Sequence, residues 1–211
     1  MKKNLEEHWN KVYASSEIFR LGWYEEDPKP SFDLISKCNL SKDAVILDVG
    51  AGATTLTGKL ISEGYKNITV TDISKNALDK LIAGLSDEQL LTVTSIVDDI
   101  TAPARITQEL RADLWHDRTV LHFLCETKQR EGYLKTLKTV VRPGGYVIIA
   151  VFSLEGAKKC SGLDVINYDE KMISEFLGEN FELIEYFDHT YIQPSGNERP
   201  FVYTLFRKIG S

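Results

Sequence analysis

The chain has 211 residues, of which 43% are hydrophobic and 27% charged, a composition typical of a folded domain rather than a disordered chain. Lysine and arginine number 25 against 31 acidic residues, so the formal net charge is −6. This balance argues against a general nucleic-acid binder, because neutralising phosphates requires an excess of clustered cations.

Targeting and redox features are few. The longest apolar run, residues 146–152, is far shorter than the roughly 20 residues that span a membrane. The N-terminal lysines are not followed by the apolar stretch of a secretory signal. The three cysteines are odd in number and lack zinc-site spacing. We therefore expect a reduced, cytoplasmic protein with no membrane role and no metal, and the oligomeric state stays open.

The apolar pattern predicts helices and strands in alternation after two N-terminal helices. Ser31 is expected to cap the second of these helices. Residues 142–145, Arg-Pro-Gly-Gly, are expected to form a tight turn between a helix and a strand. In chain order the predicted helices cover residues 4–14, 31–38, 54–65, 74–85, 127–141 and 169–180, and the predicted strands 44–49, 67–73, 91–100, 112–117, 145–152, 181–191 and 199–208.

Strands that alternate with helices predict an α/β fold with a parallel sheet, to which the last two strands add an antiparallel element at one edge. No repeat or long linker divides the chain, so residues 1–211 are expected to form one domain. We divide it into N-terminal helices (1–40), a ligand-binding core (41–152) and a loop with a C-terminal hairpin (153–211).

The segment VILDVGAGATTL contains two glycines between a buried strand and a helix, which allow a ligand close to the backbone. Asp48 precedes these glycines within the apolar strand, where a charge needs a partner. Asp72 ends the next strand, 20 residues after Gly52, and residues 98–99 end the third strand with two acids. Acids at the carboxyl ends of three strands converge on the crevice where such sheets bind ligands.

The motifs LDVGAG, TDIS, the acidic end of SIVDDI, ADLWHD and RPGG together resemble the class I S-adenosylmethionine (SAM) methyltransferases. The resemblance covers residues 40–152 by motif and the rest by element order. It implies a Rossmann-like three-layer sandwich with a mostly parallel seven-stranded sheet in the order 3-2-1-4-5-7-6, and SAM as cofactor, with S-adenosylhomocysteine as product. DLWHDR, CSGL and FVYTLFR are similar to a subgroup of small bacterial and archaeal members.

The resemblance also implies roles for individual residues at the cofactor. The acid and glycines of the first motif would surround the methionine part of SAM, with Thr54 standing where the family has a third glycine. Acids at the ends of the next strands would bind ribose and the adenine amine. The cofactor-binding residues implied are Asp48, Gly50, Ala51, Gly52, Thr54, Asp72, Ile73, Asp99, Ile100 and Asp117.

The cluster WHDR followed by His122 supplies the candidates for catalysis. Asp117 would position the nucleophile near the methyl group, and His116 or His122 would act as general base. Trp115 and Arg118 would line the acceptor side. The alternative is structural: Trp115 packs in the core, Asp117 caps the next helix and Arg118 pairs with a carboxylate.

Two further segments are candidates for the acceptor side. Trp23 and Tyr24 lie in an irregular stretch, residues 16–30, that could fold over the site as a lid. The acidic pair that follows them, Glu25-Glu26, is expected to face solvent. Cys160 follows the fifth core strand, where family members often contact substrate.

We therefore expect a SAM-dependent methyltransferase that acts on a small molecule by direct in-line transfer. A protein-lysine methyltransferase is the first alternative, because an acidic, aromatic-lined mouth could admit a cationic side chain. An NAD-dependent oxidoreductase is less consistent with Asp48 and with the missing third glycine. A non-catalytic SAM-binding module remains open, because a fold does not establish chemistry.

Overall fold

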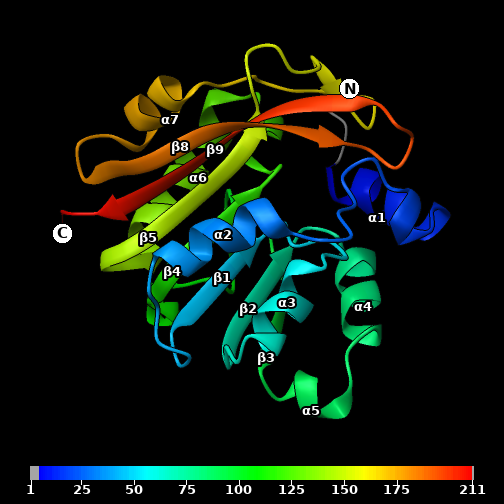
Figure 1. Cartoon of the computed structure of the whole chain (residues 1–211), viewed down its shortest axis with the longest axis horizontal. Coiled ribbons are helices and arrows are strands. Elements are labelled where there is room, and N and C mark those ends of the chain that lie inside the picture. The colour runs from blue at the N-terminus through cyan, green and yellow to red at the C-terminus, as the bar shows by residue number, and fades with distance from the viewer. Residues whose placement is uncertain (1–4, 211) are drawn as a thin grey trace.

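A computed structural model describes residues 5–210 as one seven-stranded sheet with helices on both faces (Figure 1). A separate pair of two-residue strands, β6 and β7, lies outside this sheet. The α-helices are α1 Leu5–Ser15, α2 Lys29–Lys37, α3 Leu56–Ser62, α4 Lys75–Ala83, α5 Asp87–Leu90, α6 Thr127–Val140 and α7 Glu170–Leu177. The strands are β1 Val45–Val49, β2 Asn67–Asp72, β3 Val93–Val97, β4 Ala112–Arg118, β5 Val141–Phe152, β6 Lys159–Cys160, β7 Leu163–Asp164, β8 Phe181–Ile192 and β9 Glu198–Lys208.

The strand order is β3-β2-β1-β4-β5-β9-β8, which confirms the expected order 3-2-1-4-5-7-6 when the strands of this sheet alone are counted. Strands β1 to β5 pair in parallel, while β9 runs antiparallel to both β5 and β8. The sheet is thus parallel except for its C-terminal strand. The order reverses between β1 and β4, and that reversal opens a crevice above their carboxyl ends.

Two hydrophobic cores lie on the two faces of the sheet. Helices α2, α3 and α4 contribute Leu34, Leu60 and Leu78 to one core. Helices α6 and α7 contribute Leu137 and Ile173 to the other. Because successive side chains of a strand point to opposite faces, each central strand supplies residues to both cores.

The structure corrects three local expectations. Ser31 does not cap α2: the helix begins at Lys29, because a proline in the first turn costs no hydrogen bond, and Ser31 is buried within it. Residues 142–145 belong to β5, where they form an irregularity opposite β4 instead of a separate turn. The short helix α5, with its capping box at Ser86 and Gln89, was not expected.

The C-terminal hairpin is confirmed, and a serine caps α4. Ser74 accepts a hydrogen bond from the Ala77 N–H at the start of α4. The turn at residues 193–197 joins β8 to β9. Within residues 5–210, no helix combines the length and the apolarity that a membrane crossing requires.

A substitution at Gly50 tests whether the backbone conformation of the loop after β1 requires a glycine. Its φ is +61°, and a Cβ atom there would lie 2.0 Å from Val120 Cγ2. We expect Gly50→Ala to lower the free energy of unfolding by roughly 1–3 kcal/mol through backbone strain alone. Gly58 lies within α3 with open space around it, so Gly58→Ala should be neutral or stabilising. Urea denaturation of both variants measures the difference, and equal losses would contradict the account.

Candidate functional site

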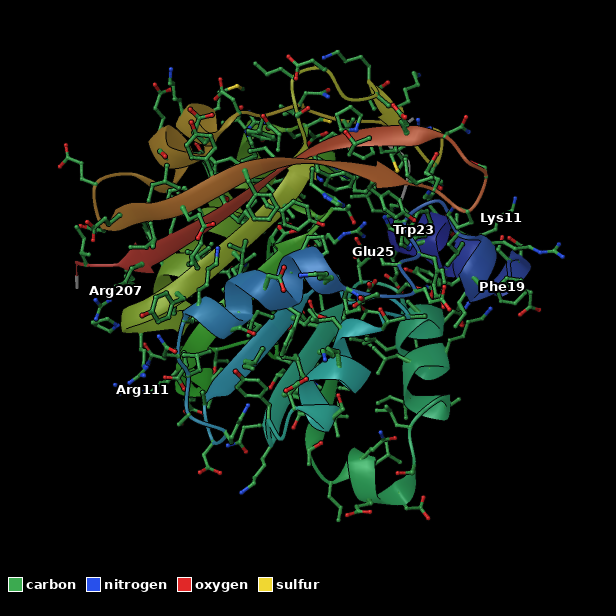
Figure 2. The ribbon with its side chains drawn as sticks, in the orientation of Figure 1. Lys11, Phe19, Trp23, Glu25, Arg111 and Arg207 are labelled. Carbon is green, nitrogen blue, oxygen red and sulfur yellow. The ribbon has the colours of Figure 1, made fainter. Side chains whose placement is uncertain are left out.

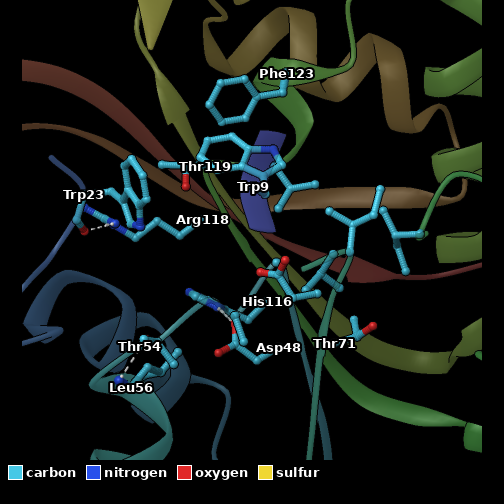
Figure 3. Close-up of a pocket in the computed structure, with 18 of the residues that line it drawn as sticks. Trp9, Trp23, Asp48, Thr54, Leu56, Thr71, His116, Arg118, Thr119 and Phe123 are labelled. Atoms are coloured by element: carbon cyan, nitrogen blue, oxygen red, sulfur yellow. Dashed lines mark hydrogen bonds and ion pairs between the residues drawn. The ribbon is translucent and has the colours of Figure 1, made fainter. Parts of the chain in front are cut away.

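A pocket lies at the carboxyl ends of β1, β2, β3 and β4, and part of the N-terminal segment closes it (Figures 2 and 3). The ends of these strands and the loops that follow them thus bring residues far apart in sequence to one place. The lining includes Trp9, Tyr13, Trp23, Tyr24, Glu25, Ser31, Asp48, Gly50, Ala51, Thr54, Asp72, Ile73, Asp99, Ile100, His116, Arg118, Thr119, Val120, Phe123 and Cys160.

The glycine loop after β1 forms the floor at one end of this pocket. Gly50 and Gly52 both have positive φ, and a Cβ on Gly52 would lie 2.2 Å from the Tyr13 hydroxyl. Thr54 stands where the family has a third glycine. Its φ is not positive, and its Oγ1 accepts a hydrogen bond from the Leu56 N–H. A side chain at this third position is therefore compatible with the loop.

Asp48 and His116 form a buried pair in the pocket wall. The carboxylate Oδ1 lies 2.7 Å from His116 Nδ1, and Nε2 of the same ring lies 2.9 Å from Ser31 Oγ. Asp48 Oδ2 has no hydrogen-bond partner among the described residues, although the side chain is buried and lines the pocket. A buried carboxylate oxygen in this state suits a cationic ligand group.

Asp72 ends β2 and accepts hydrogen bonds from the N–H groups of Gly52 and Ser74, at 2.9 and 2.8 Å. Burial raises the pKa of this carboxyl to about 6, although the backbone bonds oppose the shift. Its two hydrogen bonds fix the glycine loop to the start of α4. Ile73, which follows, also lines the pocket.

The two acids after β3 have different surroundings. Burial disfavours the charge of Asp98, yet hydrogen bonds from the Ala104, Arg105 and Ile106 N–H groups lower its pKa overall. Asp98 therefore orders the loop after β3. Asp99 is exposed at the pocket margin, and its Oδ1 accepts from the Thr101 N–H and hydroxyl.

Strand β4 divides its residues between the pocket and the core. His116 and Arg118 line the pocket, whereas Trp115 and Asp117 face α6 on the opposite side. Asp117 accepts hydrogen bonds from the Val120 N–H at 2.8 Å, the Leu121 N–H at 3.1 Å and the Tyr133 hydroxyl at 2.6 Å. The structure thus places Asp117 and Trp115 outside the pocket lining, as the structural alternative expected.

His122 also lies outside the pocket lining. Its ring packs against Phe123 and Phe152, and Nδ1 accepts a hydrogen bond from the Phe152 N–H. Burial, together with the positive charge of Arg118, lowers the pKa of His122 to about 3. The imidazole is neutral at physiological pH, and its place in the core separates it from a reacting group.

Arg118 and Glu25 form a buried ion pair on the acceptor side, with Nε 3.1 Å from Oε2. The guanidinium donates to the Tyr203 hydroxyl and to the Trp23 carbonyl. Burial raises the pKa of Glu25, although Arg118 opposes the shift. The expectation that Glu25 faces solvent is therefore wrong, because a cation more than 90 residues away in sequence draws the side chain inward.

Residues 5–25, which we call the N-terminal cover, are held over the pocket by hydrogen bonds at several points. Four consecutive carbonyls, at residues 22–25, accept hydrogen bonds from the side chains of Gln193, Arg118, Tyr191 and Thr55. At the other end, Asn10 Oδ1 in α1 accepts from the Ser74 hydroxyl and the Asn76 N–H of α4.

Aromatic rings fill the inner surface of the N-terminal cover. Trp9 packs edge to face against Trp23 and Phe123, all three labelled in Figure 3. The Trp23 indole N–H donates to the Tyr13 hydroxyl at 3.0 Å. Cys160 reaches the pocket from β6, where burial raises the pKa of its thiol to about 11. This thiol is therefore protonated at neutral pH.

Sequence reasoning missed several residues of the lining, among them Trp9, Tyr13, Ser31 and Glu25. Trp9 and Tyr13 showed helical spacing, but that pattern indicates an apolar face without saying what it covers. Ser31 was assigned to a cap, and Glu25 to solvent. For these two, only the position of their partners on β4, at residues 116 and 118, reveals the role.

Residues 46–145 match the family described as a methyltransferase domain. Three-dimensional comparison agrees: a protein studied for the conversion of a disulfide bond into a thioacetal group during echinomycin biosynthesis superposes with a TM-score of 0.78 at 18% identity. That match covers 99% of this chain and 94% of the other. That superposition shows the shared fold, while the match to a methyltransferase domain, the glycine loop and Asp48 support a SAM-dependent methyltransferase. The narrower DLWHDR subgroup stays a prediction.

Two further proteins to which the chain is similar are named methyltransferases. NodS, an N-methyltransferase from Bradyrhizobium japonicum solved with S-adenosylhomocysteine, has a TM-score of 0.70 and 18% identity, covering 99% of this chain and all of its own. EEF1A lysine methyltransferase 2 from Danio rerio is 25% identical over 196 residues, or 87% of this chain and 77% of the relative. At such identities, the solved structures establish the shared fold alone.

The residues of the pocket fit SAM as the methyltransferase's cofactor. The unpartnered Asp48 Oδ2 suits the amino group of its methionine part, and the glycine loop leaves space that a Cβ atom would fill. Asp72 and Asp99 supply carboxylates at the ends of β2 and β3 for hydroxyl and amine donors. Asp117 would act on this site only through the turn that it holds.

Tyr133→Phe tests the positioning role of Asp117. The variant removes a donor to a buried carboxylate and an acceptor for the Trp115 N–H, so we expect a loss of about 1–3 kcal/mol in the free energy of unfolding. Affinity for S-adenosylhomocysteine should stay nearly unchanged, because neither group lines the pocket. Urea denaturation and calorimetric titration measure both. Tyr186→Phe, at an exposed position, is the control, and an equal loss there would contradict the role.

Proposed function

We propose that this methyltransferase transfers a methyl group from SAM to a nucleophilic nitrogen, oxygen or sulfur atom of a small molecule. The observation that carries the proposal is one continuous pocket, which joins the glycine loop and Asp48 to the Arg118–Glu25 pair. The fastened N-terminal cover encloses this pocket. Such an enclosure suits a small acceptor and keeps water from the reacting atoms.

When bound, SAM supplies a methyl group activated by its positive sulfur, and the acceptor's lone pair forms the new bond as the carbon–sulfur bond breaks. The chain's own contribution is orientation and exclusion of water. Asp48 would hold the amino group, and Asp72 the ribose hydroxyls. The aromatic rings of the N-terminal cover would confine the acceptor.

Among the three predicted catalytic residues, His116 alone lines the pocket. We infer that it serves any acceptor that must lose a proton. With the ring proton on Nδ1 and directed at Asp48, Nε2 can take a proton through the Ser31 hydroxyl, which also lines the pocket. Asp48 would then stabilise the imidazolium.

A protein lysine is the second candidate acceptor, because curated relatives from three vertebrates carry the name EEF1A lysine methyltransferase 2. A lysine side chain is slender enough to enter a narrow pocket. Glu25, the acid beside the aromatic residues of the N-terminal cover, is already paired with Arg118. This pairing favours the small-molecule proposal.

Thermal denaturation tests the cofactor and the alternatives together. At 100 times its dissociation constant a ligand adds about 2.7 kcal/mol, so SAM and S-adenosylhomocysteine should each raise the Tm by roughly 5–10 °C. NAD should give no shift; a shift with NAD alone would indicate an oxidoreductase. Asp48→Asn should abolish most of the shift, whereas Asp43→Asn, at an exposed position, should retain it. Methyl transfer to any acceptor would exclude a non-catalytic module.

The pKa of Asp72 predicts how cofactor affinity depends on pH. This carboxyl must be ionised to accept the ribose hydroxyls in addition to its backbone bonds, and burial raises its pKa to about 6. Affinity for S-adenosylhomocysteine should therefore fall as the pH is lowered through about 6. In Asp72→Asn the affinity should be lower at neutral pH and independent of pH over that range. Calorimetric titration decides, and an unchanged pH profile in the variant would overturn the assignment.

A further inference from the structure

The acceptor end of the pocket contains a buried guanidinium with an unfilled hydrogen-bonding position. The Arg118 side chain is 10% exposed, and its Nε and Nη1 donate to the Tyr203 hydroxyl and the Trp23 carbonyl at 3.2 and 3.0 Å. Its Nη2 has no hydrogen-bond partner among residues 5–210. A buried, charged donor without a partner is costly, so this nitrogen is suited to an acceptor atom that a ligand brings.

The guanidinium points away from the part of the pocket that fits the methionine portion of SAM. Its Cζ lies 5.1 Å from the ring centroids of both Tyr191 and Phe201, on β8 and β9. Asp48 lies in β1 and the glycine loop follows that strand, on the other side of β4. In the close-up, Arg118 lies beside Trp23, and Asp48 lies beside His116 (Figure 3). The free Nη2 therefore belongs to the acceptor end.

The charges at this end select against a cationic acceptor. Glu25 is committed to Arg118, so the pair has no net negative charge to offer an ammonium group. The pair is equally neutral toward an anion, but Arg118 Nη2 offers an anion an unfilled hydrogen-bond donor on a guanidinium that Glu25, the Tyr203 hydroxyl and the Trp23 carbonyl already hold in place. One unfilled nitrogen suits a monoanionic carboxylate better than a phosphate dianion, which would need further cations.

We propose that the methyl acceptor is an apolar, preferably aromatic, carboxylic acid whose carboxylate binds Arg118 Nη2. Trp9, Trp23 and Phe123 form the apolar wall that would receive its body. The inference rests on the proposed methyltransferase function and narrows its acceptor class. It distinguishes this pocket from one that receives a lysine side chain.

The test uses benzoate and benzamide as a matched pair, because they differ in charge and not in shape. Each is titrated into the full chain saturated with S-adenosylhomocysteine, and binding is followed by tryptophan fluorescence and calorimetry. We expect benzoate to bind at least about 10-fold tighter than benzamide. Equal affinities, no benzoate binding, or tighter binding of n-butylammonium than of benzoate would overturn the proposal.

Variants at Arg118 locate this preference. In Arg118→Met the preference for benzoate over benzamide should disappear, and in Arg118→Lys part of it should remain. Arg207→Met removes an exposed arginine far from the pocket and should behave like the wild type (Figure 2). A preference for benzoate that survives in Arg118→Met would overturn the assignment to this residue.

The carboxylate of the cofactor itself is the rival ligand for Nη2, and a second comparison separates the two sources. 5′-Methylthioadenosine lacks the amino-acid part of S-adenosylhomocysteine. We expect Arg118→Met to leave the ratio of their two affinities unchanged. A fall of that ratio would overturn the proposal in favour of the cofactor carboxylate. Failure of the wild type to bind S-adenosylhomocysteine would instead overturn the proposed function itself.

Discussion

The alternation of side chains along β4 is the constraint on which the arrangement of this protein depends. Because successive residues of a strand face opposite sides, four consecutive polar or aromatic residues cannot share one site. His116 and Arg118 face the pocket, while Trp115 and Asp117 bond to Tyr133 on α6. One face of β4 therefore lines the pocket, and the other stabilises the turn that places Val120 against the glycine loop.

Burial gives the pocket its chemical character. Asp48 and Asp72 lie in a low-dielectric environment where a lone carboxylate would be costly, and each is held by specific hydrogen bonds. The oxygen of Asp48 that has no partner among the described residues is the one that a cationic group can satisfy. Arg118 presents the complementary case, a buried donor that an anion can satisfy. The two ends of the pocket thus offer ligands opposite groups, an unfilled carboxylate oxygen at one end and an unfilled guanidinium nitrogen at the other.

The N-terminal cover connects these two ends. Its helix α1 is bonded to α4 on the cofactor side, and residues 22–25 are bonded through four consecutive carbonyls to the acceptor side. Arg118 takes part in both recognition and fastening, since the same guanidinium bonds the Trp23 carbonyl and lines the pocket. This double use couples the position of the N-terminal cover to occupation of the acceptor end.

The sequence by itself determined the α/β fold and the glycine loop, because local periodicity and spacing specify strands, helices and turns. The strand order followed only from the resemblance of its motifs to the class I methyltransferases, since periodicity does not say which strands are neighbours. It also indicated Asp48 and Asp72, whose charges within or at the end of apolar strands are visible in one dimension. Only the tertiary structure decided the roles of Ser31, Glu25 and Arg118. Their partners lie about 85 to 95 residues away, and no local pattern encodes which buried donor meets which acceptor.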